Sequence, residues 1–213
     1  MAPVICMVTD RRRAGGEQAL VDRVAAAVRA GVHLVQVREP DMEARALTAL
    51  VGRCVEAARG TRARVLVNDR VDVALAAGAD GVHLKATSSA APRVRTMVPA
   101  GFLIGRSVHS REEIEHATEA GGLDFLVYGT VFETGSKPGR VPIGLGALRV
   151  AVASTPLPVL AIGGMTLATL SGVGSTGAAG FAAIGLFADP PPAEVQLSVQ
   201  RASRAFDTPL TVP

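Results

Sequence analysis

Residues 64–85 read RVLVNDRVDVALAAGADGVHLK, and this stretch contains one full cycle of the pattern that decides the fold. Residues 64–68 form a short apolar run with β-branched side chains, which is typical of a buried strand. Residues 71–77 have helical character, and residues 81–85 form a second apolar run. The stretch therefore predicts a strand, a short helix and a second strand.

The same alternation extends in both directions until it has occurred eight times. The predicted strands are residues 4–9, 33–38, 64–68, 81–85, 102–107, 125–131, 158–162 and 180–186. The predicted helices are residues 18–30, 41–59, 71–77, 110–120, 144–153, a segment opened by Thr166, and 192–206. Asp41 and Ser110 are the expected N-caps of their helices, and Glu113 completes a capping box with Ser110.

Eight strands that alternate with helices in about 200 residues favour a closed (β/α)8 TIM barrel over an open doubly wound sheet. An open nucleotide-binding sheet would carry G-x-G-x-x-G in its first βα turn, whereas this chain has Thr9, Asp10 and Arg11 there. We therefore predict an α/β barrel of one domain over residues 1–206, followed by a loose tail at 207–213.

Composition narrows the function classes. The 213 residues are 48% hydrophobic and 19% charged, and the net charge is only +3 despite a pI of 9.4. The basic run at residues 11–13 has no aromatic neighbours that would stack on bases, so it predicts a solvated loop and no nucleic-acid binding. Without a signal sequence or a long apolar run, we expect a cytoplasmic protein with no membrane contact. Cys6 and Cys54 are expected to be buried, reduced thiols.

In a barrel of this kind, ligands meet the carboxyl ends of the strands. Polar groups there are costly to bury without partners, so their clustering indicates a site. The candidates are Asp10, Gln36, Arg38, Asn68, Asp69, Lys85, Ser107, His109 and Thr130.

Glycines after the seventh strand predict a site for an anion. Gly163 and Gly164 let backbone amides approach a phosphate, and Ile184 and Gly185 after the eighth strand supply the other half of the cup. The alternative is a tight turn that needs positive φ. The loop at residues 134–139 carries Thr134, Ser136 and Lys137, and it is either a lid over an anion or a solvated loop.

Asp69 offers an oxygen ligand to a hard cation, or else forms a structural ion pair with Arg70. Among the histidines, His33 and His83 lie inside strands, where packing is the expected role, and His116 is expected at the surface. His109 reaches the mouth, where it either transfers a proton or orients the loop.

Five segments together resemble the thiamin phosphate synthase and TenI superfamily. They are residues 68–75 (NDRVDVAL), 81–84 (GVHL), 105–110 (GRSVHS), 128–134 (YGTVFET) and 161–166 (AIGGMT). The resemblance covers nearly the whole chain. It implies a (β/α)8 barrel of thiamin biosynthesis that binds a thiazole phosphate.

The resemblance implies one of two reactions. Synthases join a hydroxymethylpyrimidine pyrophosphate to thiazole phosphate with the aid of Mg²⁺, whereas TenI-type tautomerases need no cofactor and move a proton. Asp69, Thr134, Ser136 and Lys137 match the synthases, but the lysine two residues after Arg38 is missing. Ser88 replaces the second carboxylate that would hold the metal.

The tautomerase pattern is incomplete too. Thr130 occupies the position of the histidine that serves as the base, so His109 or Glu133 would have to replace it. We expect a TenI-like tautomerase first, a Mg²⁺-dependent synthase second, and a noncatalytic thiazole-phosphate-binding or regulatory protein third. A homodimer is compatible with the small, apolar residues of the outer helices.

Overall fold

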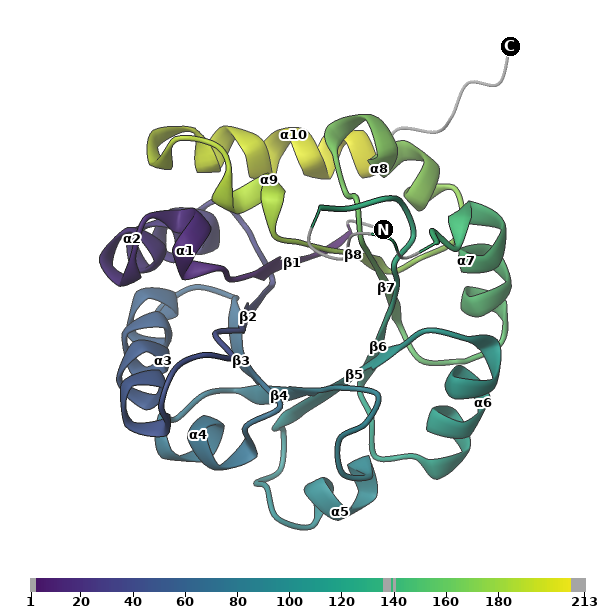
Figure 1. Cartoon of the computed structure of the whole chain (residues 1–213), viewed down its shortest axis with the longest axis horizontal. Helices are drawn as coiled ribbons and strands as arrows, with labels where there is room; N and C mark the ends of the chain where they lie inside the picture. Colours follow the sequence, from purple (N-terminus) through teal and green to yellow (C-terminus); the bar gives the residue numbers. More distant parts are fainter. Residues whose placement is uncertain (1–2, 136–138, 140, 208–213) are drawn as a thin grey trace.

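The computed structural model describes residues 3–135, 139 and 141–207. Eight parallel strands close into a barrel in sequence order, with β1 paired to β8, and helices surround it (Figure 1). The strands are β1 Val4–Val8, β2 Leu34–Val37, β3 Arg64–Asn68, β4 Gly81–Leu84, β5 Leu103–Val108, β6 Phe125–Gly129, β7 Val159–Ile162 and β8 Gly180–Ala183. The predicted barrel is confirmed.

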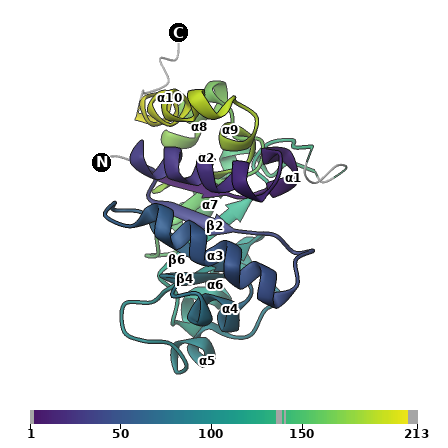
Figure 2. The same ribbon diagram turned by 90° about the vertical axis from the view of Figure 1, so that its left-hand side faces the viewer.

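The helices form the outer layer. They are α1 Arg11–Ala14, α2 Glu17–Arg29, α3 Ala44–Ala58, α4 Val71–Ala76, α5 Ala91–Arg95, α6 Arg111–Ala120, α7 Gly144–Ala153, α8 Leu167–Gly174, α9 Gly185–Ala188 and α10 Val195–Asp207, with a 3₁₀ turn at Pro192–Glu194. Figure 2 shows α2 and α3 side by side along one flank. No helix of the described ranges is long and apolar enough to cross a bilayer.

The core has two layers because successive side chains of a strand point to opposite faces. One layer lies between the strands and the helices. The other fills the lower barrel interior and is formed by Cys6, Val8, Leu34, Leu66, Phe125, Val127, Leu160 and Ala182. Since this inner layer fills the barrel interior, a ligand site is expected at the carboxyl ends of the strands.

Both cysteines are buried free thiols, as expected. Burial raises the pKa of Cys6 and of Cys54 to about 12, so both thiols stay protonated at neutral pH. Neither has the thiolate character that nucleophilic chemistry requires.

Two predicted boundaries are wrong. β8 ends at Ala183, and the glycine that follows Ile184 begins the short helix α9 instead of continuing a strand. Asp41 does not cap a helix, because α3 begins at Ala44 with Glu43 as its N-cap. The N-cap at Ser110 is confirmed, since its side chain accepts the Glu113 N–H, but the Glu113 side chain accepts the His109 N–H and does not complete the predicted capping box. Thr166 opens α8 as predicted.

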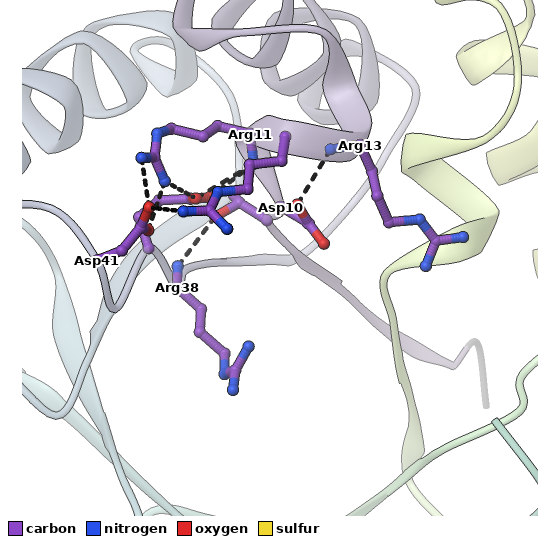
Figure 3. Close-up of polar contacts among 8 residues, drawn as sticks. Asp10, Arg11, Arg13, Arg38 and Asp41 are labelled. Atoms are coloured by element: carbon purple, nitrogen blue, oxygen red, sulfur yellow. Dashed lines mark hydrogen bonds and ion pairs between the residues drawn. The ribbon is translucent and has the colours of Figure 1, made fainter. Parts of the chain in front are cut away.

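The basic run is not a solvated loop. Residues 11–14 form α1, and Arg11 pairs with Glu39 at 3.2 Å and with Asp41 at 2.6 Å (Figure 3). Arg12 also pairs with Asp41, and Arg13 pairs with Asp189. These contacts hold the pKa of Asp41 well below its usual range, chiefly through the hydrogen bond from Arg11. The arginines therefore tie the first βα loop to the second and to the last.

Candidate functional site at the barrel mouth

A cavity of about 750 Å³ opens at the carboxyl ends of the strands. Of the residues singled out from the sequence, those that line it are Gln36, Arg38, Asn68, Lys85, Ser107, His109, Thr130, Glu133, Thr134, Gly163, Gly164, Ile184 and Gly185. Asp69 lies beside it and reaches it through Lys85. Ser136 and Lys137 fall outside the described residues.

The glycine pair after β7 forms a turn that no other residue would fit. Gly163 has φ +102° and Gly164 has φ +65°. A Cβ on Gly163 would lie 2.5 Å from Thr130 Cγ2, and one on Gly164 would lie 2.5 Å from the Glu133 carbonyl oxygen. The two glycines are thus needed for a tight turn with positive φ, as the alternative interpretation predicted. The same turn places their backbone in the cavity wall.

Backbone donors at the ends of β7 and β8 have no backbone acceptor in the described part of the chain. Among the described residues, the N–H groups of Gly164, Met165 and Gly185 donate no backbone hydrogen bond. All three residues line the cavity at the ends of the neighbouring strands β7 and β8. Backbone amides that line a cavity and have no backbone acceptor among the described residues are suited to bind a phosphate group.

Cationic side chains lie on the other side of the mouth. The backbone N–H of Arg38 donates to Thr9 Oγ1 at 2.9 Å, and the Thr9 hydroxyl donates to the buried Glu39 carboxylate at 2.6 Å. This chain of bonds fixes the backbone of Arg38, whose guanidinium extends away from the α1 ion pairs into the mouth (Figure 3). Arg13, which was predicted to lie in a solvated loop, also lines the cavity, but on the β8 side, where it pairs with Asp189.

Asp69 follows β3 with φ +64°, a conformation that aspartate tolerates better than most residues. Its Oδ2 lies 2.5 Å from Lys85 Nζ, and its Oδ1 accepts a hydrogen bond from the Ser88 hydroxyl. Partial burial raises the pKa of Asp69, but the hydrogen bonds from Lys85 and Ser88 outweigh this effect and hold the pKa below its usual range. The expected partner Arg70 pairs with Asp72 instead.

These residues do not fit a magnesium site. Both oxygens of Asp69 are already engaged, one by an ammonium and one by a hydroxyl. Within residues 3–135, 139 and 141–207, no group of three His, Cys, Asp or Glu side chains is placed to hold a metal ion. Magnesium can be held by one or two carboxylates together with substrate phosphates, but the one carboxylate here already faces an ammonium. Magnesium prefers several oxygen ligands in octahedral geometry, and a cation at one of them repels it.

Polar side chains form the floor of the cavity. Gln36 Nε2 donates to Asn68 Oδ1 at 3.0 Å, and His83 Nε2 lies 2.8 Å from Ser107 Oγ. Burial, reinforced by the charge of Arg106, lowers the pKa of His83 to about 4, so the ring is neutral at neutral pH. A neutral, hydrogen-bonding floor suits an uncharged heteroaromatic ring better than a phosphate.

His83 was expected to pack, and it does lie against Phe125 with a ring separation of 6.0 Å. It also lines the cavity, which the sequence reasoning missed. The signal was available, because His83 pairs with Asn68 in the β3–β4 register and therefore faces the same side. His33 is half-buried directly before β2, where its Nδ1 accepts the Ile5 N–H, and His116 is exposed as expected.

His109 is held by its loop on two sides. Its Nδ1 lies 2.6 Å from the Gly129 carbonyl oxygen, so Nδ1 must carry the proton and donate it. Its backbone N–H donates to Glu113 Oε2 at 2.7 Å. The ring therefore orients the loop, and Nε2 is left with a lone pair at the mouth.

Arg106 fastens the loop that carries Lys85 and Ser88. Its guanidinium donates to the carbonyl oxygens of Ala86 at 3.1 Å and of Ser89 at 2.5 Å. The loop is thus held against β5, which fixes the position of the Lys85 backbone relative to Asp69.

The comparisons with known proteins agree with this geometry. Residues 5–187 match the family described as thiamine monophosphate synthase. The chain is 41% identical over 182 residues to the thiamine-phosphate synthase of Roseiflexus sp. (strain RS-1), covering 85% of this chain and 76% of that one. It is also 41% identical over 190 residues to a putative thiamine-phosphate synthase of Geobacter sulfurreducens, covering 88% of each. Its fold is similar to the solved thiamine phosphate pyrophosphorylase of Pyrococcus furiosus, with TM-score 0.83, 31% identity and 95% of both chains covered.

Proposed function

The chain belongs to the thiamine monophosphate synthase family, and we propose that it is itself a thiamine-phosphate synthase that joins hydroxymethylpyrimidine pyrophosphate to thiazole phosphate. The names of its relatives favour this reaction over the thiazole tautomerase that the sequence alone had placed first.

One observation carries the proposal. A single cavity has free amides at the ends of β7 and β8 and the side chains of Arg38 and Lys85 at the ends of β2 and β4. These strand pairs lie on different sides of the closed barrel (Figure 1). The mouth can therefore hold two anionic substrates at once, one on each side, with their rings over the neutral floor. A tautomerase acts on one substrate and does not need the second anion site.

The proposed reaction does not require the histidine base that Thr130 replaces. The bond from the pyrimidine methylene carbon to the pyrophosphate oxygen breaks, and the lone pair of the thiazole nitrogen forms the new bond to that carbon. Negative charge grows on the leaving pyrophosphate, where Arg38 and Lys85 would stabilise it. No proton is removed from either substrate in this step, so Thr130 in place of a histidine is no handicap.

One feature favours the tautomerase as a second candidate. Because His109 Nδ1 donates to the Gly129 carbonyl, Nε2 keeps the lone pair that a general base requires. Glu133 also lines the cavity and is exposed. A tautomerase would exchange the proton of the thiazole carboxylate phosphate with deuterium from D₂O, and His109→Gln would abolish that exchange.

The deciding experiment offers the purified chain both substrates of the synthase and measures pyrophosphate and thiamine phosphate together. We expect the two products in equal amounts, and we expect Arg38→Met to slow their formation by about 100-fold. Arg59→Met, which removes the same charge from an exposed ion pair with Glu56 remote from the cavity lining, is the matched control. If the chain binds thiazole phosphate but forms neither product nor exchanged substrate, it is the noncatalytic binding protein.

A further inference from the structure

The ion pair between Lys85 and Asp69 sits where the resemblance would place a metal ion. Lys85 Nζ lies 2.5 Å from Asp69 Oδ2, and the Ser88 hydroxyl donates to Asp69 Oδ1. Ser88 is in turn held by the Lys85 backbone, whose N–H donates to Ser88 Oγ at 2.9 Å. We call these three residues the Asp69 cluster.

The charges of the Asp69 cluster balance without a metal. A site that consists of Mg²⁺ and two carboxylates has no net charge. Here the second carboxylate is absent, Ser88 stands in its place, and one ammonium faces one carboxylate. Lys85 and Ser88 are the two departures from the synthase pattern, and they compensate each other. Ser88 removes the second carboxylate that would bind Mg²⁺, and the Lys85 ammonium supplies the positive charge that Mg²⁺ would have supplied.

The ammonium is available to a ligand. It carries three N–H donors and, among the residues that the structure describes, uses one on Asp69, which leaves two. The Lys85 side chain is 55% exposed and lines the main cavity, whereas the Asp69 side chain is 27% exposed and lies behind it. Arg106 holds the intervening loop by its carbonyl groups, so Lys85 is placed by the fold.

We propose that the Lys85 ammonium is the built-in cation of this site and binds the terminal anion of the substrate directly, so that anion binding at the mouth requires no divalent metal. Asp69 then acts as a positioning residue for Lys85. The identity of the anion as a pyrophosphate group rests on the proposed function, but the binding mode does not.

The experiment titrates the full chain with inorganic pyrophosphate by calorimetry, first in EDTA and then with excess Mg²⁺. We expect binding in EDTA, and we expect Lys85→Met to weaken it by about tenfold because it removes a charge-assisted hydrogen bond. Arg59→Met removes one positive charge far from the mouth and should leave the dissociation constant unchanged. Circular dichroism of Lys85→Met checks that the exposed substitution preserves the fold.

Asp69→Asn separates the two explanations. If Asp69 only positions Lys85, the asparagine oxygen can still accept a hydrogen bond from the ammonium, while the negative charge beside the anion is removed, so pyrophosphate should bind about twofold to tenfold more tightly in EDTA. If Asp69 holds a metal, the same substitution should weaken binding, and Mn²⁺ alone should give a bound electron paramagnetic resonance signal that Asp69→Asn removes.

Two results would overturn the proposal: pyrophosphate that binds only when Mg²⁺ is present, or pyrophosphate that binds Lys85→Met as tightly as the original chain. Failure of the synthase reaction is a separate outcome. If the chain makes no thiamine phosphate but binds pyrophosphate in EDTA through Lys85, the proposed role of Lys85 stands and only the proposed synthase function is wrong.

Discussion

At the scale of single residues, His83 shows how burial decides a protonation state. Its ring lies on the cavity floor beside Ser107, and its Nδ1 has no hydrogen-bond partner among the described residues. Protonation would place an unpaired charge in a desolvated site near Arg106, which is why the pKa falls to about 4. The neutral ring therefore leaves Nδ1 buried without a partner in the described ranges and Nε2 bonded to Ser107.

This lowered pKa predicts how stability depends on pH. An unfolded histidine titrates near pH 6.5, so between about pH 6.5 and pH 4 the histidine is protonated in the unfolded chain but not in the folded chain. The contribution of His83 to the free energy of unfolding is therefore complete above about pH 6.5 and is lost progressively toward pH 4, by up to about 3 kcal/mol. Urea unfolding at about pH 7.5 and about pH 4.5 measures it.

His83→Gln is the matched variant for this measurement, because it keeps a polar side chain next to Ser107 but cannot titrate. Its free energy of unfolding should fall less between the two pH values than that of the original chain. Equal losses in the two proteins would show that other groups cause the pH dependence.

At the scale of elements, the turn between β7 and α8 joins a backbone requirement to the anion site. Gly164→Ala places a methyl group 2.5 Å from the Glu133 carbonyl oxygen at a positive φ. The turn must then distort, which we expect to lower the free energy of unfolding by about 1–3 kcal/mol and to abolish phosphate binding. Denaturant unfolding and calorimetry with inorganic phosphate measure the two effects.

Gly146→Ala is the control for this substitution. Gly146 lies in α7 with no atom near the added methyl group, so alanine should raise the free energy of unfolding by up to about 1 kcal/mol. A chain with Gly164→Ala that still binds phosphate normally would show that the amides of this turn are not the anion site.

At the scale of the whole molecule, the barrel was predictable because its pattern is long and repeated, whereas the short elements were not. The eight apolar runs fix eight strands, and a one-residue error at a strand end changes nothing in the order of the sheet. Helices α1, α5 and α9 have four or five residues and lack a recognisable period, so they were missed.

The site residues likewise divide into those that the sequence predicts and those that depend on loop structure. Residues at strand ends, such as Gln36 and Asn68, were predictable because the barrel rule places them at the mouth. The pairing of Lys85 with Asp69 was not, because it depends on a left-handed turn after β3 and on a loop held by Arg106. For a similar reason, the position of Arg13 was not predicted. A run of three arginines is typical of a solvated loop, but here it lies in the short helix α1, whose arginines pair with Glu39, Asp41 and Asp189.

These carboxylates give a prediction about how the mouth is held together. Arg11 contacts two of them, but Glu39 has a side chain only 3% exposed, and that of Asp41 is 35% exposed. Glu39 also accepts hydrogen bonds from the Thr9 hydroxyl and the Arg11 backbone N–H, so it joins the loops after β1 and β2 beneath Arg38. Glu39→Gln should lower the free energy of unfolding by about 2 kcal/mol, because it leaves buried donors without a charged acceptor.

Asp41→Asn removes the exposed partner of the same arginine, and water can replace that contact, so urea unfolding should find little change. The two variants should also differ at the mouth. Loss of Glu39 frees the Thr9 hydroxyl that anchors the Arg38 backbone, which should raise the KM for the pyrimidine pyrophosphate in the synthase assay, whereas loss of Asp41 should not. Equal effects of the two substitutions on stability and on KM would mean that the α1 ion pairs act only as surface charge.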